Sequence, residues 1–437
     1  MAKVMYSVLL FVKDESYEED LESTIGAIQQ QMGEHIYEIF LVSHMELAPW
    51  RDIRIFPVKE AMEEISGKYV LFLSAETFLV GDSLARMRQL LEDNRGVGAA
   101  GPFLNRSHNG FQQCFPGKAY KSIRELQEMI GTWQERDAAE NKRVMHLDDH
   151  CLLVRRSALL EAGAPDGRIP GMWASDFSLR LLLAGYRLRI CGTAYAHCDR
   201  QAFSEEERQL GREAFHEKWG FHCGYSMNIR DSLLGTVDVR RKGIRVLDLG
   251  CACGGTLMWL REVNPSAELY GIEFNSTAAW VAKTWGQVLN VDLETWDDPE
   301  WRGKFDIIIM GDILEHLRDT EGVLKKVNGW LKPDGQVLLS VPNVMHISVL
   351  HDLLRLGRWH YQEEGILDRT HLRFFTRKEI VDYVQEAGFA IQDMMHSEVK
   401  LCDAWQDVLD ALKGSVVQDG WEDCLAVQWI LVLGKGQ

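Results

Sequence analysis

The sequence predicts an α/β protein of two domains. The chain has 437 residues, which exceeds the usual size of one domain, so two domains of about 200 residues each are expected. Apolar segments with strand character alternate with helical patterns in both halves, which favours largely parallel sheets covered by helices. The segment 244–255, IRVLDLGCACGG, reads as a strand, a tight turn and the start of a helix. We place the domains at 1–220 and 221–437.

Polar residues follow the predicted strands of the second half. Asp248 ends the first strand, before a turn of small residues that lets the backbone approach a nucleotide cofactor, and its carboxylate can hold an ammonium or hydroxyl group. The second strand, AELYGIEF, closes with Glu273, which is placed to bind the two hydroxyls of a ribose. Asp292 follows near an adenine edge, and the strand in KFDIIIMGDILEHL runs into Asp312 and His316. This order predicts a parallel, doubly wound sheet with a ligand at the carboxyl ends of its strands.

These motifs resemble class I S-adenosylmethionine-dependent methyltransferases over roughly residues 222–437. VLDLGCACGG stands where the family has a GxGxG turn, and YGIEFN, NVDLE and DILEHL stand at its ribose, adenine and fourth motifs. The resemblance implies a Rossmann-like seven-stranded sheet, S-adenosyl-L-methionine as cofactor, and a cofactor site made by Asp248, Gly250, Cys251, Ala252, Gly254, Glu273, Phe274, Asp292, Leu293, Met310 and Asp312. Ala252 replaces the middle glycine, which should be tolerated if φ is negative there. A dinucleotide dehydrogenase is the alternative, but it prefers GxGxxG and does not predict LEHL followed by LKPDGQVLLSVPN.

Charge and composition limit the partners and the compartment. The formal net charge of −17 argues against nucleic acid or an anionic membrane surface as the main partner. The N-terminal apolar run VMYSVLLFV is too short to span a bilayer and lacks a cleavage-site pattern. Nine cysteines without CxxC pairs resemble neither a disulfide framework nor a zinc site. We therefore expect a cytoplasmic protein with no membrane span and reduced cysteines.

The first half also alternates strands and helices. SVLLFV, YEIFLVS, KYVLFLSAET and VGAAGPFL have strand character, and helices are predicted around 18–30, 60–66 and 83–93. The segments GKYVLFL, CLLVRRSALLEAG and LRLLLAGYRL, the last ahead of His197, resemble family 2 glycosyltransferases of the GT-A type. That resemblance implies a nucleotide-sugar fold over residues 1–220 and a nucleotide-sugar donor.

The chemical positions of that glycosyltransferase family are largely lost here. Ser43 replaces the Asp that touches uracil, only Glu76 remains of the paired carboxylates that hold a metal, and Trp173 and Ala174 replace the acidic pair before Asp176. These losses favour a degenerate domain that binds or positions a glycan. Glu76 could still hold Mn²⁺ or Mg²⁺, and Asp176 could act as base if the register differs by two residues. A metal is expected only if this domain is active, while His197, His216 and Trp219 fit packed positions better than ligand contacts.

Methyl transfer is an in-line displacement, so the protein aligns the acceptor and, where necessary, removes its proton. The candidate bases are His316, just beyond the fourth strand, and Asp368 and His371 in the segment 361–376, YQEEGILDRTHLRFFT. In methyltransferases that resemble this one, such a segment lies over the active-site mouth. A helix-capping histidine and a buried ion-pair loop are the structural alternatives. The candidate acceptor-binding residues are Asn343, Arg369 and Arg373, with Pro342 and His346 nearby.

The predicted reaction is O-methylation of a sugar in a glycan under assembly, and the predicted partner is that sugar or glycan acceptor. Fusion to a glycosyltransferase-like domain motivates this substrate, which is an inference from association. A bifunctional enzyme that adds a sugar and methylates it is the first alternative, and it would also take a nucleotide-sugar. A non-catalytic glycan-binding scaffold is the second, and the intact cofactor motif disfavours it.

Overall fold

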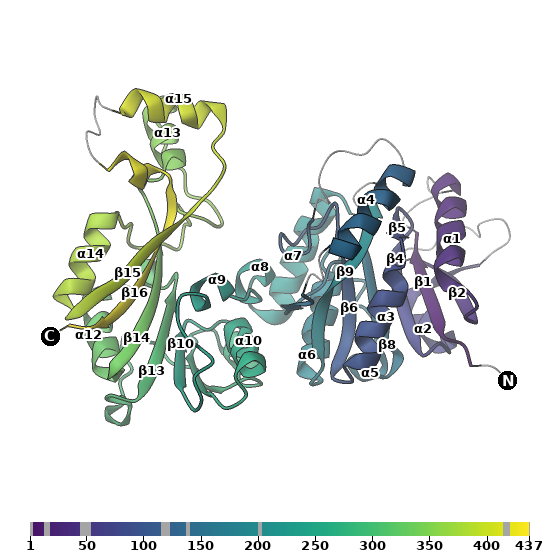
Figure 1. Ribbon diagram of the computed structural model, residues 1–437, viewed down its shortest axis with the longest axis horizontal. Coiled ribbons are helices and arrows are strands. Elements are labelled where there is room, and N and C mark those ends of the chain that lie inside the picture. The colour runs from purple at the N-terminus through teal and green to yellow at the C-terminus, as the bar shows by residue number, and fades with distance from the viewer. Residues whose placement is uncertain are drawn as a thin grey trace. The chain divides into compact units, whose positions relative to one another are not determined.

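The computed structural model describes residues 3–12, 18–43, 54–114, 123–136, 140–199, 203–413 and 420–436. The chain divides into two compact units, Met1–Asn228 and Ile229–Gln437, which are described separately below (Figure 1). The first unit extends eight residues past the boundary that the sequence predicts, because a short helix at Cys223–Ser226 belongs to it.

A mixed sheet forms the centre of the first unit. Its strands lie in the order β3-β2-β1-β4-β8-β6-β9-β5, and β7 pairs with β9. The strands β1 to β4 run parallel, whereas β8 runs antiparallel to both of its neighbours, β4 and β6. The strand bounds are β1 Tyr6–Phe11, β2 Tyr37–Ser43, β3 Ile55–Pro57, β4 Tyr69–Ser74, β5 Thr77–Val80, β6 Val97–Leu104, β7 Lys142–Val144, β8 Cys151–Arg155 and β9 Arg187–Cys198.

Helices connect these strands. The helix that follows β9 begins at a capping box, in which the Ser204 side chain accepts a hydrogen bond from the Glu207 amide and the Glu207 side chain accepts one from the Ser204 amide. It ends at Gly220, whose φ of 74° suits a left-handed helix end. The helix bounds are α1 Glu18–Met32, α2 Val58–Glu64, α3 Ser83–Asp93, α4 Ile123–Arg136, α5 Arg156–Ala162, α6 Trp173–Leu183, α7 Glu205–Trp219 and α8 Cys223–Ser226.

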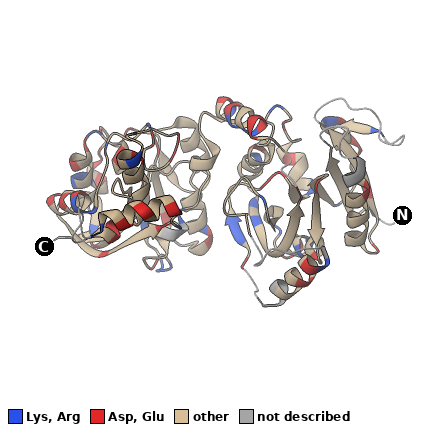
Figure 2. Cartoon of the chain, turned by 90° about the horizontal axis from the view of Figure 1, so that it is seen from above, with Lys and Arg blue, Asp and Glu red and all other residues tan. Residues whose placement is uncertain are grey.

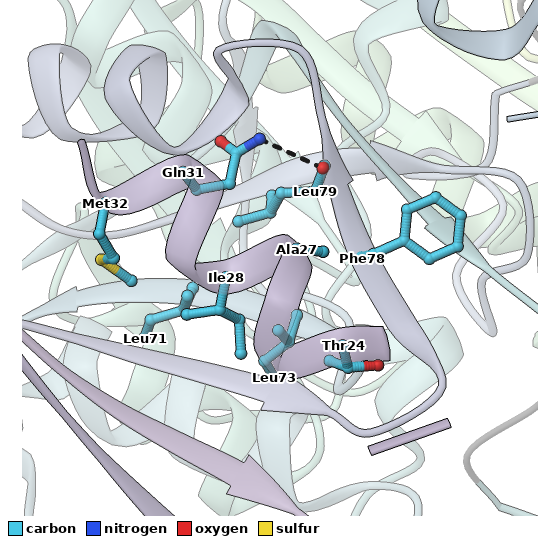
Figure 3. A pocket seen from close by; sticks show the side chains of 9 residues that line it. All are labelled: Thr24, Ala27, Ile28, Gln31, Met32, Leu71, Leu73, Phe78 and Leu79. Atoms are coloured by element: carbon cyan, nitrogen blue, oxygen red, sulfur yellow. Dashed lines mark hydrogen bonds between the residues drawn. The ribbon is translucent and has the colours of Figure 1, made fainter. Parts of the chain in front are cut away.

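A small apolar recess lies between α1 and the strands β4 and β5 (Figure 3). Ile28 and Leu79 line it, and the Gln31 side-chain amide donates a hydrogen bond to the Leu79 carbonyl oxygen at 3.3 Å. The gap has no room for a water molecule. It is therefore a packing gap between helix and sheet and not a ligand site.

The second unit contains the predicted seven-stranded sheet, in the order β12-β11-β10-β13-β14-β16-β15. The strands from β12 to β14 are parallel, as the sequence predicts, whereas β16 runs antiparallel to both β14 and β15, a direction that was not predicted. β16 is antiparallel to β15 because the connection through α15 and η4 leaves and re-enters the sheet at the same end, so that Glu398 pairs with Ala426. The bounds are β10 Arg245–Leu249, β11 Glu268–Ile272, β12 Gln287–Leu289, β13 Phe305–Gly311, β14 Leu331–Pro342, β15 Phe389–Glu398 and β16 Ala426–Lys435.

Both faces of this sheet are buried. Leu247 and Leu249 point into one hydrophobic core, while Val246 belongs to the core on the opposite face, as the two-residue period of a strand requires. A third, smaller apolar cluster joins α13 and α15, which lie side by side in Figure 1. The helices are α9 Asp231–Leu234, α10 Gly255–Val263, α11 Ser276–Ala282, α12 Thr320–Trp330, α13 Ile347–Arg355, α14 Arg377–Glu386 and α15 Asp403–Leu412, with 3-10 turns η2 Pro299–Trp301, η3 Leu314–His316 and η4 Trp421–Cys424.

Charged side chains of both signs are interspersed over the two units in the view of Figure 2, although the net charge is −17. Among the residues that the structure describes, no helix has the length and apolar character that crossing a bilayer requires.

Candidate functional site

The turn between β10 and α10 has the backbone shape of a nucleotide-binding loop. Gly250 has a φ of 66° and Gly254 a φ of 79°, which are left-handed values that glycine adopts without strain. A Cβ atom on Gly250 would also lie 2.9 Å from Cδ1 of Ile313. The predicted glycine requirement at these two positions therefore has two physical causes, backbone conformation and close packing.

Ala252 differs from the sequence expectation. Its φ is 47°, so the condition under which the sequence predicts that alanine is tolerated here, a negative φ, is not met. The left-handed conformation brings Cβ close to the following carbonyl and costs about 1–2 kcal/mol. The amide nitrogen of Ala252 donates to Oε2 of Glu273 at 2.9 Å, and this bond helps to hold the strained turn.

We expect Ala252→Gly to stabilise the protein by about 1 kcal/mol, because relief of about 1–2 kcal/mol of strain exceeds the roughly 0.4–1 kcal/mol that the freer unfolded glycine costs. Urea unfolding followed by circular dichroism measures the change. Ala404→Gly, at an exposed position in α15, is the matched control and should lose about 0.5–1 kcal/mol. Equal losses in both variants would show that Ala252 is not strained.

Glu273 follows β11 and lies directly beside the turn. Its Oε2 accepts the Ala252 amide, and its Oε1 accepts the Asn275 amide at 2.7 Å. Burial raises the pKa of Glu273, while these backbone hydrogen bonds act in the opposite direction. Each carboxylate oxygen has a second lone pair, so Glu273 can hold the turn and still accept two ribose hydroxyls.

Asp248 is the most deeply buried carboxylate of the turn, with 3% of its surface exposed. The pKa of Asp248 is raised to about 7. Burial is the largest cause and the carboxylate of Glu273 also raises the pKa, whereas the guanidinium of Arg230 lowers it. A carboxylate that burial destabilises in this way gains most from a cationic ligand such as an ammonium group.

The Asp248 shift predicts a pH dependence of stability. The folded state holds the Asp248 proton more tightly than the unfolded chain, so stability falls as pH rises toward the folded pKa. We expect the free energy of unfolding to fall by about 2 kcal/mol between pH 5 and pH 8 through this group alone. Urea titrations of Asp248→Asn should show a flatter profile, whereas Asp334→Asn, at an exposed position of β14, should keep the original slope. An unchanged slope in Asp248→Asn would contradict the assignment.

Arg230 is a site residue that the sequence analysis missed. Its guanidinium pairs with Asp312, which also accepts a hydrogen bond from the Ser340 hydroxyl at 2.9 Å. Gly311 makes this possible, because a Cβ there would lie 2.6 Å from Cδ of Arg230. Asp312 itself has a φ of 51°, a strained value for an aspartate. Arg230 lies ahead of β10 in no recognised motif, and residues 221–229 before it contain no Lys or Arg, so no local sequence signal pointed to it.

The other predicted cofactor residues divide into exposed and buried positions. Phe274 is 77% exposed at the edge of the turn, and Asp292 is exposed with its carboxylate accepting the Glu294 amide at 2.8 Å. Cys251, Leu293 and Met310 are buried, and all three pack in the hydrophobic cores. The side chains of these three residues therefore have packing roles. The prediction that they contact the cofactor now applies to their backbone atoms only.

The structure brings together the two histidines that the sequence nominates as bases. His316 ends η3, and the segment 361–376 folds back so that the amides of Leu372 and Arg373 donate to the Glu315 carbonyl at 2.7 and 3.0 Å. The rings of His316 and His371 then lie 4.8 Å apart, centroid to centroid. Asp368 lies in the same segment, where its Oδ1 accepts from the amide and hydroxyl of Thr370.

The three predicted acceptor ligands have structural partners. The Asn343 amide is fully buried and donates to the carbonyls of Asp423 and Ala426, both at 2.7 Å. Arg369 pairs with Glu363 at 2.6 Å on the surface, and Arg373 donates to the Arg318 carbonyl at 2.7 Å. The bonds of Asn343 hold the end of β14 against the start of β16, and those of the two arginines hold the 361–376 segment. Acceptor binding by the three residues stays a prediction.

Glu76 of the first unit lies beside a buried polar cluster that the sequence analysis also missed. Burial raises the pKa of Glu76, and the positive charge of His150 lowers it. Asp148 is fully buried and accepts a hydrogen bond from His150, and its carboxylate lies 2.8 Å from Nδ1 of His108. Burial alone would lower the pKa of His108, but Asp148 and Asp149 outweigh it and raise that pKa to about 9. The run Asp-Asp-His directly before β8 was the available signal.

Asp176, the other predicted nucleotide-sugar residue, belongs to a different set of interactions. Its carboxylate is fully buried and lies 2.9 Å from a guanidinium nitrogen of Arg180 and 2.6 Å from Nζ of Lys218. The indole of Trp219 also donates to it at 2.9 Å. Asp176 therefore ties α6 to α7, and its role as a base stays a prediction.

A family model described as a methyltransferase domain matches residues 226–393. The C-terminal region contains a class I S-adenosylmethionine-dependent methyltransferase domain. This match begins just before Arg230 and includes the glycine-rich turn, Glu273, η3 and the 361–376 segment.

Curated relatives of the methyltransferase domain are O- and N-methyltransferases. A malonyl-[acyl-carrier protein] O-methyltransferase of Bacillus anthracis is 29% identical over 159 residues, covering 34% of this chain and 57% of that protein. A ubiquinone biosynthesis O-methyltransferase of Marinobacter nauticus is 27% identical, covering 35% and 66%. A phosphoethanolamine N-methyltransferase of Triticum aestivum is 30% identical over 105 residues, covering 23% and 21%. The chain thus spans less than two thirds of the length of these relatives.

Two matches among solved structures illustrate the likeness. One is an S-adenosylmethionine-dependent methyltransferase from Mesorhizobium loti, with 15% identity, a TM-score of 0.34, and coverage of 46% of this chain and 95% of that chain. The other is PKMT2 from Rickettsia typhi in complex with AdoHcy, with 13% identity, a TM-score of 0.33, and coverage of 44% and 49%.

The residues of the methyltransferase domain fit S-adenosylmethionine. The cofactor carries a ribose diol, an ammonium and a carboxylate, and the site offers Glu273, the buried carboxylate of Asp248 and the guanidinium of Arg230. Each pairing joins a donor to an acceptor or opposite charges.

Proposed function

We propose that the chain is a methyltransferase that transfers the methyl group of S-adenosylmethionine to a hydroxyl of a sugar in a glycan under assembly. In this proposal the first unit is a GT-A-like domain that binds or positions the glycan. One observation carries the assignment of methyl transfer. The hydrogen bond from the Ala252 amide to Glu273 couples the ribose-binding carboxylate to the glycine-rich turn.

Several features support an oxygen acceptor and a sugar. Two of the three relatives named above act as O-methyltransferases. In the first unit, β1 lies between β2 and β4, which is a switch point of strand order where ligands bind in open α/β sheets, and Glu76 follows β4 at that end. The proposal of a sugar acceptor rests on this placement of Glu76 and on the presence of both units in one chain.

The chemistry divides between cofactor and protein. S-adenosylmethionine, when bound, supplies an electrophilic methyl group on a sulfonium. Glu273 and the turn orient the nucleoside, while Asp248 and Arg230 hold the charged groups of the methionine end. His316 and His371 lie beyond β13, on the acceptor side, where a neutral imidazole can accept the hydroxyl proton. Alignment of the acceptor oxygen with the methyl carbon accounts for the remaining rate enhancement.

Glu273→Gln tests the cofactor site. The amide keeps the shape of the carboxylate but loses its charge, and charge-assisted hydrogen bonds are worth about 1.5–3 kcal/mol. We expect the affinity for S-adenosylhomocysteine to fall at least about tenfold by calorimetry. Glu268→Gln, which breaks an exposed ion pair with Arg245 at the start of the same strand, should leave the affinity unchanged. Unaltered binding in Glu273→Gln would remove the basis of the proposal.

A bifunctional enzyme is the second candidate, and the buried polar cluster beside Glu76 favours it. Thermal-shift measurements with UDP, GDP and dTDP, with and without Mn²⁺, separate the candidates. Stabilisation by a nucleotide that depends on Mn²⁺ and is lost in Glu76→Gln supports the bifunctional enzyme. Stabilisation by S-adenosylhomocysteine alone supports the methyltransferase with a positioning domain, and stabilisation by neither class supports a scaffold.

A further inference from the structure

Glu315, His316 and His371 form a compact group at the acceptor side of the methyltransferase domain. Each of the three side chains offers one possible ligand atom, and these atoms lie within 4.8 Å of one another. Glu315 and His316 come from η3, whereas His371 comes from a segment more than fifty residues later in the chain. The backbone bonds from Leu372 and Arg373 to the Glu315 carbonyl fix the two segments against each other.

Glu315 has an unusual environment. Only 1% of its surface is exposed, and neither of its carboxylate oxygens accepts a hydrogen bond from any residue that the structure describes. Burial raises the pKa of Glu315 well above its usual range, and the nearby carboxylate of Asp312 adds to the shift. A buried carboxylate without hydrogen bonds is costly, and such groups are normally paired or coordinate a metal.

Hydrogen bonds to the two imidazoles select one tautomer. Nδ1 of His371 lies 3.0 Å from the carbonyl oxygen of Ile366, and Nδ1 of His316 lies 3.3 Å from that of Thr370. A carbonyl oxygen only accepts, so both Nδ1 atoms carry the proton and both Nε2 atoms keep a lone pair. Backbone carbonyls orient metal-binding histidines in this way.

We propose that Glu315, His316 and His371 bind one divalent transition-metal ion. Two imidazoles and one carboxylate are a ligand set that suits zinc and manganese, and three protein ligands leave positions open for water or substrate. The sequence predicts no metal in this half of the chain, and the two histidines are its candidate bases. If the histidines acted only as bases, Glu315 would have no function. If they bind a metal, all three residues share one function.

The metal has a chemical task if the domain methylates a hydroxyl, and in this respect the inference rests on the proposed function. A hydroxyl oxygen bound in an open position loses its proton to bulk water near neutral pH, because the metal stabilises the alkoxide. The alkoxide oxygen then forms a bond to the methyl carbon as the carbon–sulfur bond breaks. The electron pair of that bond stays on sulfur, which neutralises the sulfonium.

The experiment measures metal binding directly. The full chain is stripped with EDTA, dialysed against Zn²⁺ or Mn²⁺ alone, and its metal content is determined by inductively coupled plasma mass spectrometry. The first unit also brings His108, Asp148 and Asp149 within 4.8 Å, so every measurement is repeated in a His108→Ala background. We expect about one equivalent in that background, at least a tenfold loss of affinity in Glu315→Gln, and a similar loss in His316→Ala should Glu315→Gln fail to fold.

Glu398→Gln is the matched control. Glu398 pairs with His396 at 2.7 Å on β15 as an exposed histidine–glutamate pair, and its substitution should leave the metal content unchanged. The proposal is overturned if the His108→Ala protein binds no metal at millimolar Zn²⁺ or Mn²⁺, or if Glu315→Gln and His316→Ala retain the full equivalent. Calorimetry with S-adenosylhomocysteine on the same samples tests the proposed function separately: loss of that binding with metal retained would contradict the function and leave the metal site intact.

Discussion

Replacement of His371 by Ala should lower turnover by about 10²–10⁴-fold while the affinity for S-adenosylmethionine stays nearly unchanged. His371 is 9% exposed, lies against the His316 ring, and belongs to the acceptor side of the domain. A group that removes the acceptor proton, or that holds a metal for this purpose, acts in the transition state and contributes little to cofactor binding. His316→Ala should behave in the same way, because the two rings act on one acceptor.

Three measurements on each variant separate catalysis from structure: melting temperature, cofactor affinity and turnover on the acceptor. A histidine that only packs would lower all three together. His396→Ala, on β15, is the control histidine and should retain turnover. Full turnover in both His371→Ala and His316→Ala would exclude both residues from the chemistry and leave alignment alone, or Asp368, to carry the step.

Replacement of Arg230 by Met should weaken S-adenosylmethionine binding by about tenfold to a hundredfold. The guanidinium pairs with Asp312 and lowers the pKa of Asp248. Methionine keeps much of the side-chain length but removes the charge, which leaves two carboxylates without their common cation. Loss of a charge-assisted bond of about 1.5–3 kcal/mol corresponds to that change in affinity.

Arg241→Met is the control for Arg230. Arg241 stands on the same segment before β10 and pairs with Asp306 at 3.0 Å, but it is half exposed. Calorimetry should show wild-type affinity for Arg241→Met. If Arg230→Met also binds with wild-type affinity, Arg230 supports Asp312 only and takes no part in cofactor recognition.

Local sequence was sufficient for many elements of the fold. The predicted strand VGAAGPFL and the helix around 83–93 coincide with β6 and α3, because strand composition and helical periodicity act within a few residues. The antiparallel direction of β16 was not predictable in this way. A strand in the middle of a sheet has the same apolar composition in either direction, and its direction depends on where the preceding connection returns.

The site shows the same division. Asp248 and Glu273 were predicted as neighbours because the carboxyl ends of adjacent parallel strands meet at one edge. Arg230 was not, since its pairing with Asp312 joins segments 82 residues apart. The sign of φ at Ala252 could not be read from the sequence, because it depends on bonds to residues outside the turn, such as the one from the Ala252 amide to Glu273.

The position of β16 has a consequence for the synthesis of this domain. β16 lies between β14 and β15, although it is the last of the three to be translated. While a nascent chain still lacks residues 426–435, β14 and β15 each present an unpaired edge that can join with another chain. We therefore expect ribosome-bound chains that stop before residue 426 to expose apolar surface and recruit chaperones, and chains in which β16 has left the exit tunnel to release them.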